Sequence, residues 1–63
     1  MEKLENGYEV GVVRANNLGM EVYIGWLLLN GQLVASCEAF TESQARTSIM
    51  HKYQKIQEVK ELH

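Results

Sequence analysis

The dipeptide Asn30-Gly31, which lies between two apolar runs, constrains the fold of this chain more than any other feature. Both residues tolerate the positive φ angles of a type I′ turn, so an Asn-Gly pair between apolar segments predicts two antiparallel strands. We therefore predict a β-hairpin over Val22–Phe40. A regular two-residue loop gives cross-strand partners that include Leu28 with Leu33, Trp26 with Ala35 and Ile24 with Cys37.

A second apolar run, Tyr8–Ala15, precedes the hairpin and predicts another strand because it is rich in valine. The segment Asn16–Gly19 that follows has turn composition, since Asn and Gly accept left-handed backbone conformations. A four-residue loop there pairs Arg14 with Glu21, which is favourable because their charges are opposite. A two-residue loop shifts the partners but leaves every side chain on the same face of the sheet.

The residues after the hairpin have the pattern of an amphipathic helix. Thr41 followed three residues later by Gln44 is a capping box, in which each side chain satisfies an exposed amide at the start of a helix. We expect the helix to run from about Glu42 to about Glu61. Apolar residues recur along it at spacings of three and four, which predicts one buried stripe: Ala45, Ile49, Tyr53, Ile56 and Val59.

These elements predict an α+β fold, a three-stranded antiparallel meander followed by one C-terminal helix (β-β-β-α). A chain of 63 residues makes a single small α+β domain, 1–63, whose stability is marginal because it buries only part of its surface. Residues 1–6 are polar, and we expect them to be frayed.

One helix covers only one face of such a sheet, yet both faces are apolar. The first face carries Val13, Val22, Ile24, Trp26, Leu28, Leu33, Ala35 and Cys37. We predict that this face is the core, because the large Trp26 opposite the small Ala35 leaves room for a crossing helix. The second face is then a candidate interface, made of Tyr8, Val10, Val12, Tyr23, Leu27, Leu29 and Val34. The reverse assignment stays open, and it also leaves one apolar face uncovered.

Composition and charge argue against several classes of partner. Hydrophobic residues make up 46% of the chain but form no run of roughly 18 that would span a membrane, and the first residues lack the apolar core of a signal peptide. The formal charge of −2 provides no attraction to nucleic acid or to an anionic membrane. Cys37 is the single cysteine, so it cannot form an internal disulfide, which is typical of a cytoplasmic protein.

Residues that could take part in catalysis or metal binding are few and scattered. Cys37 and His51 have the residue types of a nucleophile and its base, but a small buried thiol on a strand and a surface histidine on a helix explain both. His51 and His63 do not have the spacing of metal ligands. We expect no catalytic residue, no metal and no cofactor. Three strand carboxylates are typical of solubilising side chains: Glu9, Glu21 and Glu38.

The uncovered apolar face predicts a non-catalytic protein that acts through protein–protein contact, most simply as a homodimer. The alternative is a nucleic-acid-binding regulator of phage or mobile-element type that uses the sheet face. Tyr8 and Tyr23 share one face, as the stacking aromatics of single-strand binders do. Such platforms are surrounded by Lys and Arg, whereas this face has only Arg14, with Glu21 beside it. Protein contact is therefore the favoured prediction.

The segment Asn30–Ala45 contains a glycine turn followed by Ser36, Glu38, Phe40 and Thr41, and then the predicted helix. In these residues it resembles the YegP-like family of small bacterial proteins, although Cys37 and Ala39 replace a serine and a glycine of the family pattern. The resemblance implies three strands and a helix, and it implies no activity. The order of elements is also similar to that of the plant AP2-type domain and of phage-integrase arm-binding domains, whose basic DNA-contacting strands are missing here.

Overall fold

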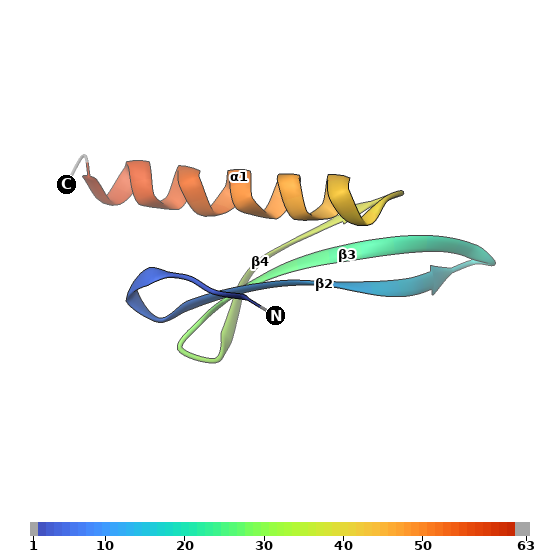
Figure 1. Cartoon of the computed structure of the whole chain (residues 1–63), viewed down its shortest axis with the longest axis horizontal. Helices are drawn as coiled ribbons and strands as arrows, with labels where there is room; N and C mark the ends of the chain where they lie inside the picture. Colours follow the sequence, from blue (N-terminus) through green and yellow to red (C-terminus); the bar gives the residue numbers. More distant parts are fainter. Residues whose placement is uncertain (1, 62–63) are drawn as a thin grey trace.

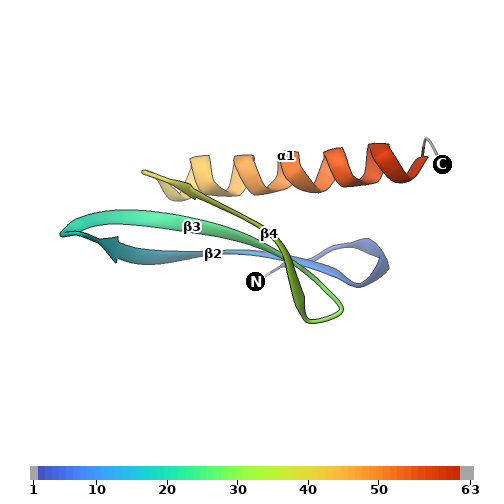
Figure 2. The ribbon, with the colours of Figure 1, turned by 180° about the vertical axis from the view of Figure 1, so that it is seen from behind.

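The chain folds into a four-stranded antiparallel sheet with one long helix laid across one face (Figure 1). The structure is a computed structural model that describes the backbone of residues 2–61 and the side chains of residues 2–60. The view from behind shows the helix on one side of the sheet only (Figure 2). The sheet order is β1-β2-β3-β4, and the elements are β1 (Glu2–Lys3), the short 3-10 helix η1 (Glu5–Gly7), β2 (Tyr8–Asn17), β3 (Met20–Leu29), β4 (Gln32–Ala39) and α1 (Glu42–Glu61).

The antiparallel sheet and the C-terminal helix agree with the predicted fold class, but the sheet has four strands and not three. The first strand, β1, lies in the segment that was expected to fray, and it pairs Lys3 with Glu9. The Leu4 amide also donates to the Tyr8 carbonyl at 2.8 Å, which ties the start of the chain to β2. Backbone hydrogen bonds therefore hold this segment, except for Met1, which lies outside the described residues.

The β2–β3 and β3–β4 hairpins each turn through two residues with positive φ. Asn30 (φ 51°) and Gly31 (φ 86°) adopt the conformations that a type I′ turn requires, which confirms the predicted turn between β3 and β4. Between β2 and β3 the turn residues are Leu18 (φ 54°) and Gly19 (φ 83°), so the predicted four-residue loop is wrong. The register moves by two positions and pairs Arg14 with Tyr23, but because the shift is even each side chain keeps its predicted face.

A β-bulge changes the second half of β4. Leu28 pairs with Leu33 as predicted, but Leu27 pairs with Ala35, so Val34 is an extra residue in β4. The side chains from Ala35 to Ala39 are therefore turned to the opposite face from the one predicted, and Trp26 pairs with Ser36. The bulge turns the small apolar residues Ala35, Cys37 and Ala39 towards α1, where they can be buried. It turns the polar Ser36 and Glu38 away from α1.

The helix covers the face that carries Tyr8, Val10 and Leu27, and these three residues form the buried cluster together with Ile49 of α1. The predicted core face is therefore wrong, and the reverse assignment, which the sequence left open, is the correct one. The residues that pack around the cluster come from β3, β4, α1 and the segment before β2: Leu4, Leu29, Ala35, Cys37, Met50, Tyr53 and Ile56.

Two glycines decide which face receives the helix. A Cβ atom on Gly25 would lie 2.8 Å from the Ala45 carbonyl oxygen and 2.9 Å from Cys37 Sγ, so α1 approaches β3 at a point where a side chain has no room. A Cβ atom on Gly11 would lie 2.1 Å from the ring of Trp26, on the other face. The indole thus lies against the backbone of β2, and it fills the space that we had predicted for a crossing helix.

The start of α1 confirms the Thr41 half of the predicted capping box, whereas the Gln44 side chain makes no hydrogen bond back to Thr41. Thr41 Oγ1 accepts a hydrogen bond from the Gln44 amide at 3.1 Å, and the Thr41 carbonyl accepts one from Ala45 at 3.0 Å. The far half of the helix is held by Tyr8, whose ring meets the Tyr53 ring edge-on with 5.2 Å between centroids. The predicted stripe is buried or half-buried from Ala45 to Ile56, but Val59 is exposed.

The hairpin turn between β3 and β4 leads to a first prediction. Gly31→Val places a β-branched residue at φ 86° and should lower the free energy of unfolding by about 1–3 kcal/mol. Gly31→Asn is the matched control, because Asn tolerates the left-handed region and should cost clearly less. Thermal unfolding followed by circular dichroism measures both changes. Superimposable melting curves for Gly31→Val and the wild type would contradict the assigned turn.

The assignment of the two faces leads to a second prediction, based on neighbouring leucines. Leu27→Ala removes a fully buried side chain and should cost about 2–5 kcal/mol, which leaves a domain of this size largely unfolded. Leu28→Ala removes the same atoms from the half-buried opposite face and should cost less than about 2 kcal/mol. Urea unfolding at low chain concentration compares the two variants, and equal losses would show that the faces are assigned wrongly.

Candidate functional site

The predicted interface residues lie on the helix side of the sheet, with one exception. Tyr8, Val10 and Leu27 are buried beneath α1, so they are not available to a partner in this fold. Val12, Tyr23 and Leu29 are half-buried on the same side. Only Val34, the extra residue of the bulge, is exposed. The pattern that identified a surplus apolar face was sound, but it could not tell which of the two faces the helix would choose.

The surface that remains free of the helix is the opposite side of the sheet, which we call the open face. Its side chains follow from the registers and from the pleat of the strands, which points alternate residues to opposite sides. The open face consists of Lys3 of β1, Glu9, Gly11, Val13 and Ala15 of β2, Val22, Ile24, Trp26 and Leu28 of β3, and Leu33, Ser36 and Glu38 of β4.

The open face is apolar along its centre and has carboxylates at two corners. Val13 is 48% exposed and Leu33 is 62% exposed, while Ile24, Trp26 and Leu28 are half-buried among their neighbours. Its charged residues are Glu9, Glu38 and Lys3, the cross-strand neighbour of Glu9 on β1. A solvated face of an antiparallel sheet normally carries polar side chains at these alternate positions, so this one has the composition of a buried surface.

The hairpin tip between β2 and β3 adds apolar surface at one end of the open face. Leu18 is 98% exposed and has a φ of 54°, a conformation that is unfavourable for a bulky residue. Its turn is supported by Asn16, whose side-chain oxygen accepts a hydrogen bond from Gly19 at 3.0 Å. Met20 and Phe40 are also exposed at this end, because the last β3–β4 pair is Tyr23 with Ala39. The sequence of this tip, a Leu between Asn and Gly, predicted a turn but not an exposed apolar side chain.

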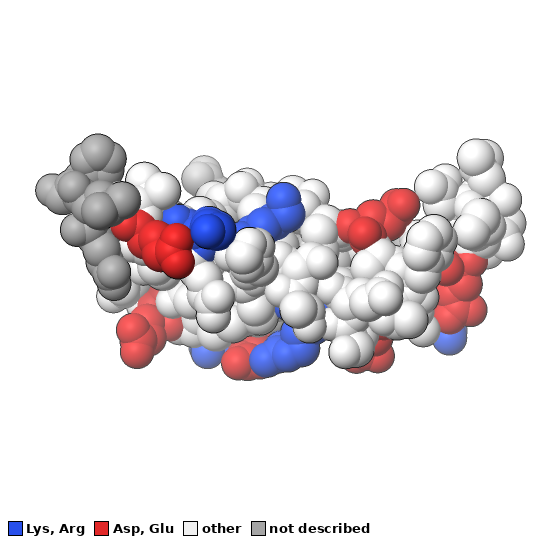
Figure 3. Space-filling view, turned by 90° about the horizontal axis from the view of Figure 1, so that it is seen from above, with Lys and Arg blue, Asp and Glu red and all other residues white. Residues whose placement is uncertain are grey.

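The helix side of the molecule is charged and mixed in sign. Figure 3 shows Lys and Arg interspersed with Asp and Glu on this side, without a continuous basic area among the described residues. Arg46 forms an ion pair with Glu2, and Lys55 pairs with Glu58 at 3.6 Å. Lys60 donates a hydrogen bond to the Tyr8 hydroxyl at 2.8 Å. The distribution is that of a solvated surface and not of a nucleic-acid platform.

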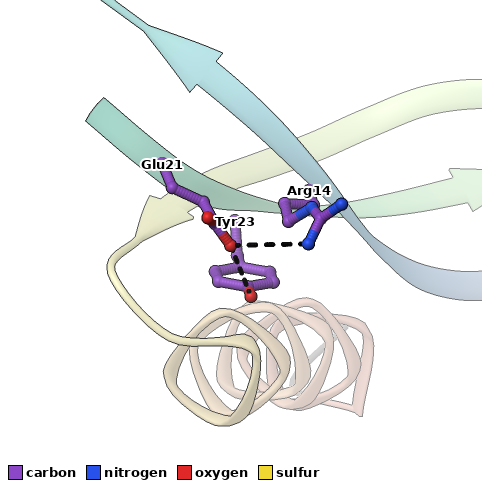
Figure 4. A network of polar contacts seen from close by, with 3 residues as sticks. All are labelled: Arg14, Glu21 and Tyr23. Carbon is purple, nitrogen blue, oxygen red and sulfur yellow. Dashed lines mark hydrogen bonds and ion pairs between the residues drawn. The ribbon is translucent and has the colours of Figure 1, made fainter. Parts of the chain in front are cut away.

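Tyr23 belongs to a small polar cluster near the hairpin tip, where Figure 4 shows it pointing towards α1. Its hydroxyl donates to Glu21 Oε1 at 3.1 Å, and the same oxygen lies 3.8 Å from Arg14 Nη1. The hydrogen bond to Glu21 is the main cause that raises the pKa of Tyr23 above 10.0, with desolvation and the Glu21 charge adding to it. Arg14 and Glu21 are thus near neighbours as predicted, although they sit diagonally and not directly opposite.

The remaining candidate residues are placed apart in the fold. The Cys37 thiol is half-buried beneath α1 and donates to the Ala45 carbonyl at 3.3 Å, whereas His51 is exposed on the helix. His63 lies outside the described residues. Among the residues that the structure describes, no group of three or more His, Cys, Asp or Glu side chains is placed to hold a metal ion. No helix within residues 2–61 is long and apolar enough to cross a membrane.

Comparison of the chain with protein families, with curated proteins and with solved structures finds no match. The resemblance of Asn30–Ala45 to the YegP-like family therefore stays a prediction. The apolar side chains of the open face carry the functional argument on their own.

The Tyr23 cluster yields a pH prediction. Glu21→Gln removes the charged acceptor, so the pKa of Tyr23 should fall towards 10.0. Because the folded pKa is raised, the stabilisation from this contact is present below pH 10.0 and is lost as the pH rises through the folded value. Phenolate absorbance during alkaline titration measures the shift, and Tyr23→Phe identifies which of the three tyrosines is responsible. Identical titration curves for Glu21→Gln and the wild type would contradict it.

Proposed function

We propose that this chain is a non-catalytic protein that acts through protein–protein contact and forms a homodimer through its open face. The observation that supports the proposal is the composition of that face, whose exposed central side chains are apolar while the single helix occupies the other side. An apolar surface of this extent on a small domain is typical of a contact site. Trp26, at its centre, is of the residue type that most often contributes strongly to binding.

The size of the open face suits a dimer of modest affinity. Three strands spaced about 4.8 Å apart, with a rise of about 3.3 Å per residue, make a surface roughly 10 Å wide and 30 Å long before side-chain relief is counted. Burying about 500 Å² of apolar surface per subunit gives a gross gain of about 12 kcal/mol per subunit. The loss of translational and rotational freedom and the ordering of side chains offset much of this gain, which leaves dimerisation at micromolar concentration or below.

A nucleic-acid-binding regulator is the weaker alternative. Tyr8, one of the two predicted stacking residues, is 2% exposed beneath the helix and cannot stack on a base in this fold. The open face has one aromatic residue within its strands, Trp26, and its charges are the carboxylates of Glu9 and Glu38 and the ammonium group of Lys3. Carboxylates repel the phosphate backbone, so the electrostatics of this face favour a protein partner.

The proposal includes a cytoplasmic location. Cys37 is the single cysteine of the chain, and its thiol donates a hydrogen bond to the Ala45 carbonyl at 3.3 Å within the sheet–helix contact. A half-buried thiol in this position packs as a small apolar residue, which fits a protein that stays reduced.

A matched pair of substitutions tests the contact surface. Val13→Lys places an ammonium group in the proposed interface and should weaken dimerisation at least about a hundredfold, because the charge is buried without a partner. Val59→Lys is the control, since Val59 is similarly exposed (56% against 48% for Val13) but lies on α1. Sedimentation equilibrium measures both dissociation constants, and circular dichroism confirms that both variants fold.

Two results would contradict the proposal. One is a wild-type chain that is monomeric at about 100 μM, a concentration at which an association of micromolar affinity is nearly complete. The other is a dimer that Val13→Lys leaves intact while Val59→Lys dissociates it, which would place the contact on the helix.

A further inference from the structure

We infer that the second copy docks on the open face with its strands antiparallel to those of the first, so that the hairpin tip of each subunit covers the β3–β4 turn end of the other. This inference rests on the proposed homodimer and specifies its geometry. In aligned packing, two facing sheets keep their strands within about 30° of each other, and the partner's strands can then run in two directions.

A symmetric dimer of two facing sheets has its two-fold axis in the plane between them. If the axis runs along the strands, each strand faces one of the same direction, and β2 lies over β4 of the partner subunit. If the axis runs across the strands, every strand lies over its own copy in the opposite direction. Gly25 pairs with Val12 on one side and with Cys37 on the other. These registers give the residues of the two subunits that lie over each other for each axis.

The axis across the strands matches apolar with apolar side chains. With the axis beneath Gly25, Trp26 lies over Ile24 of the partner subunit. Leu28 lies over the position of Val22 of the partner subunit, a residue that is only 4% exposed within its own chain. Leu33, which pairs with Leu28, lies over Phe40 of the partner subunit, the residue that follows the last β3–β4 pair. Leu33 (62%) and Phe40 (68%) are among the most exposed large hydrophobic residues of the described chain, and each covers the other here.

The Glu38 carboxylate discriminates between the two directions. With the axis across the strands, Glu38 lies over Ser36 of the partner subunit, whose hydroxyl can donate to it, and Glu9 meets Ala15 of the partner subunit at the rim. With the axis along the strands, Glu38 lies over Val13 of the partner subunit and Glu9 lies over Leu33 of the partner subunit. The second direction buries Glu38 against an apolar group without a hydrogen-bond donor, which is unfavourable. Glu9 has Lys3 of its own subunit as its cross-strand neighbour in either direction.

The exposed ends of the open face support the same direction. Leu18, Met20 and Phe40 extend the apolar surface at the hairpin tip, and Leu33 and Val34 extend it at the other end. The antiparallel arrangement places each tip over the opposite end of the other subunit, so both extensions are covered. In this arrangement Leu18, which is held at φ 54°, contacts the partner subunit. This contact explains why an exposed position carries an apolar side chain.

Single cysteines in a Cys37→Ser background test the arrangement. Leu33→Cys and Phe40→Cys are mixed, and a thiol crosslinker that spans about 10 Å, the distance between packed sheets, is added. The mixture should form a covalent dimer at least about tenfold faster than either variant alone, since only the mixed dimer brings the two thiols together. Within one chain the two positions are roughly 20 Å apart along the strand, beyond the reach of the reagent.

Leu28→Cys alone provides the opposite test. It should not crosslink to itself in the antiparallel arrangement, but it would do so if the strands of both subunits ran in the same direction. Rapid crosslinking of Leu28→Cys together with a slow mixed reaction would overturn the inferred direction and leave the homodimer standing. A chain that is monomeric by sedimentation overturns the proposed function itself, so the two failures are distinguishable. Both substituted side chains of the mixture are exposed, and circular dichroism under reducing conditions confirms their fold.

Discussion

The close approach of α1 to β3 at Gly25 is the contact on which the rest of the structure depends. A methyl group at this position would lie 2.8 Å from the Ala45 carbonyl and 3.1 Å from Ile49 Cβ, so only glycine admits the helix so near the sheet. Small residues on both sides of the contact, Ala45 and Cys37, allow the same approach. The helix is then able to bury Leu27 and Ile49 completely, which provides most of the core of a short chain.

The opposite face follows from the same arrangement. Trp26 cannot point into the core when its neighbours Gly25 and Leu27 do, and its ring lies against Gly11 of the adjacent strand. The indole therefore lies in the open face, and the apolar surface there is covered by no helix or strand of residues 2–61. No second helix within residues 2–61 covers that surface, and we propose that a second copy of the chain does so.

The elements that local chemistry controls could be predicted from the sequence. The Asn30-Gly31 turn, the Thr41 cap and the limits of α1 depend on the φ preferences and hydrogen-bonding groups of a few neighbouring residues. The existence of one surplus apolar face was also predictable, since it requires only the alternation of side chains along the strands. The strand β1 was not predicted, because its two polar residues pair with β2 through backbone groups. The Asn6-Gly7 dipeptide before β2, with φ angles of 61° and 86°, was the turn signal that the sequence analysis missed.

The sequence by itself determined the two hairpins, the helix and the excess of apolar surface, because each of these depends on residues close together in the chain. Only the tertiary structure decided which face the helix covers and where the bulge at Val34 lies. Both sheet faces are apolar, so periodicity cannot distinguish them, and the choice depends on whether glycine or tryptophan meets the helix across long sequence separations. The sequence therefore predicted an uncovered apolar face but placed it on the wrong side of the sheet. Which side stays uncovered depends on where the helix packs, and no local sequence pattern determines that.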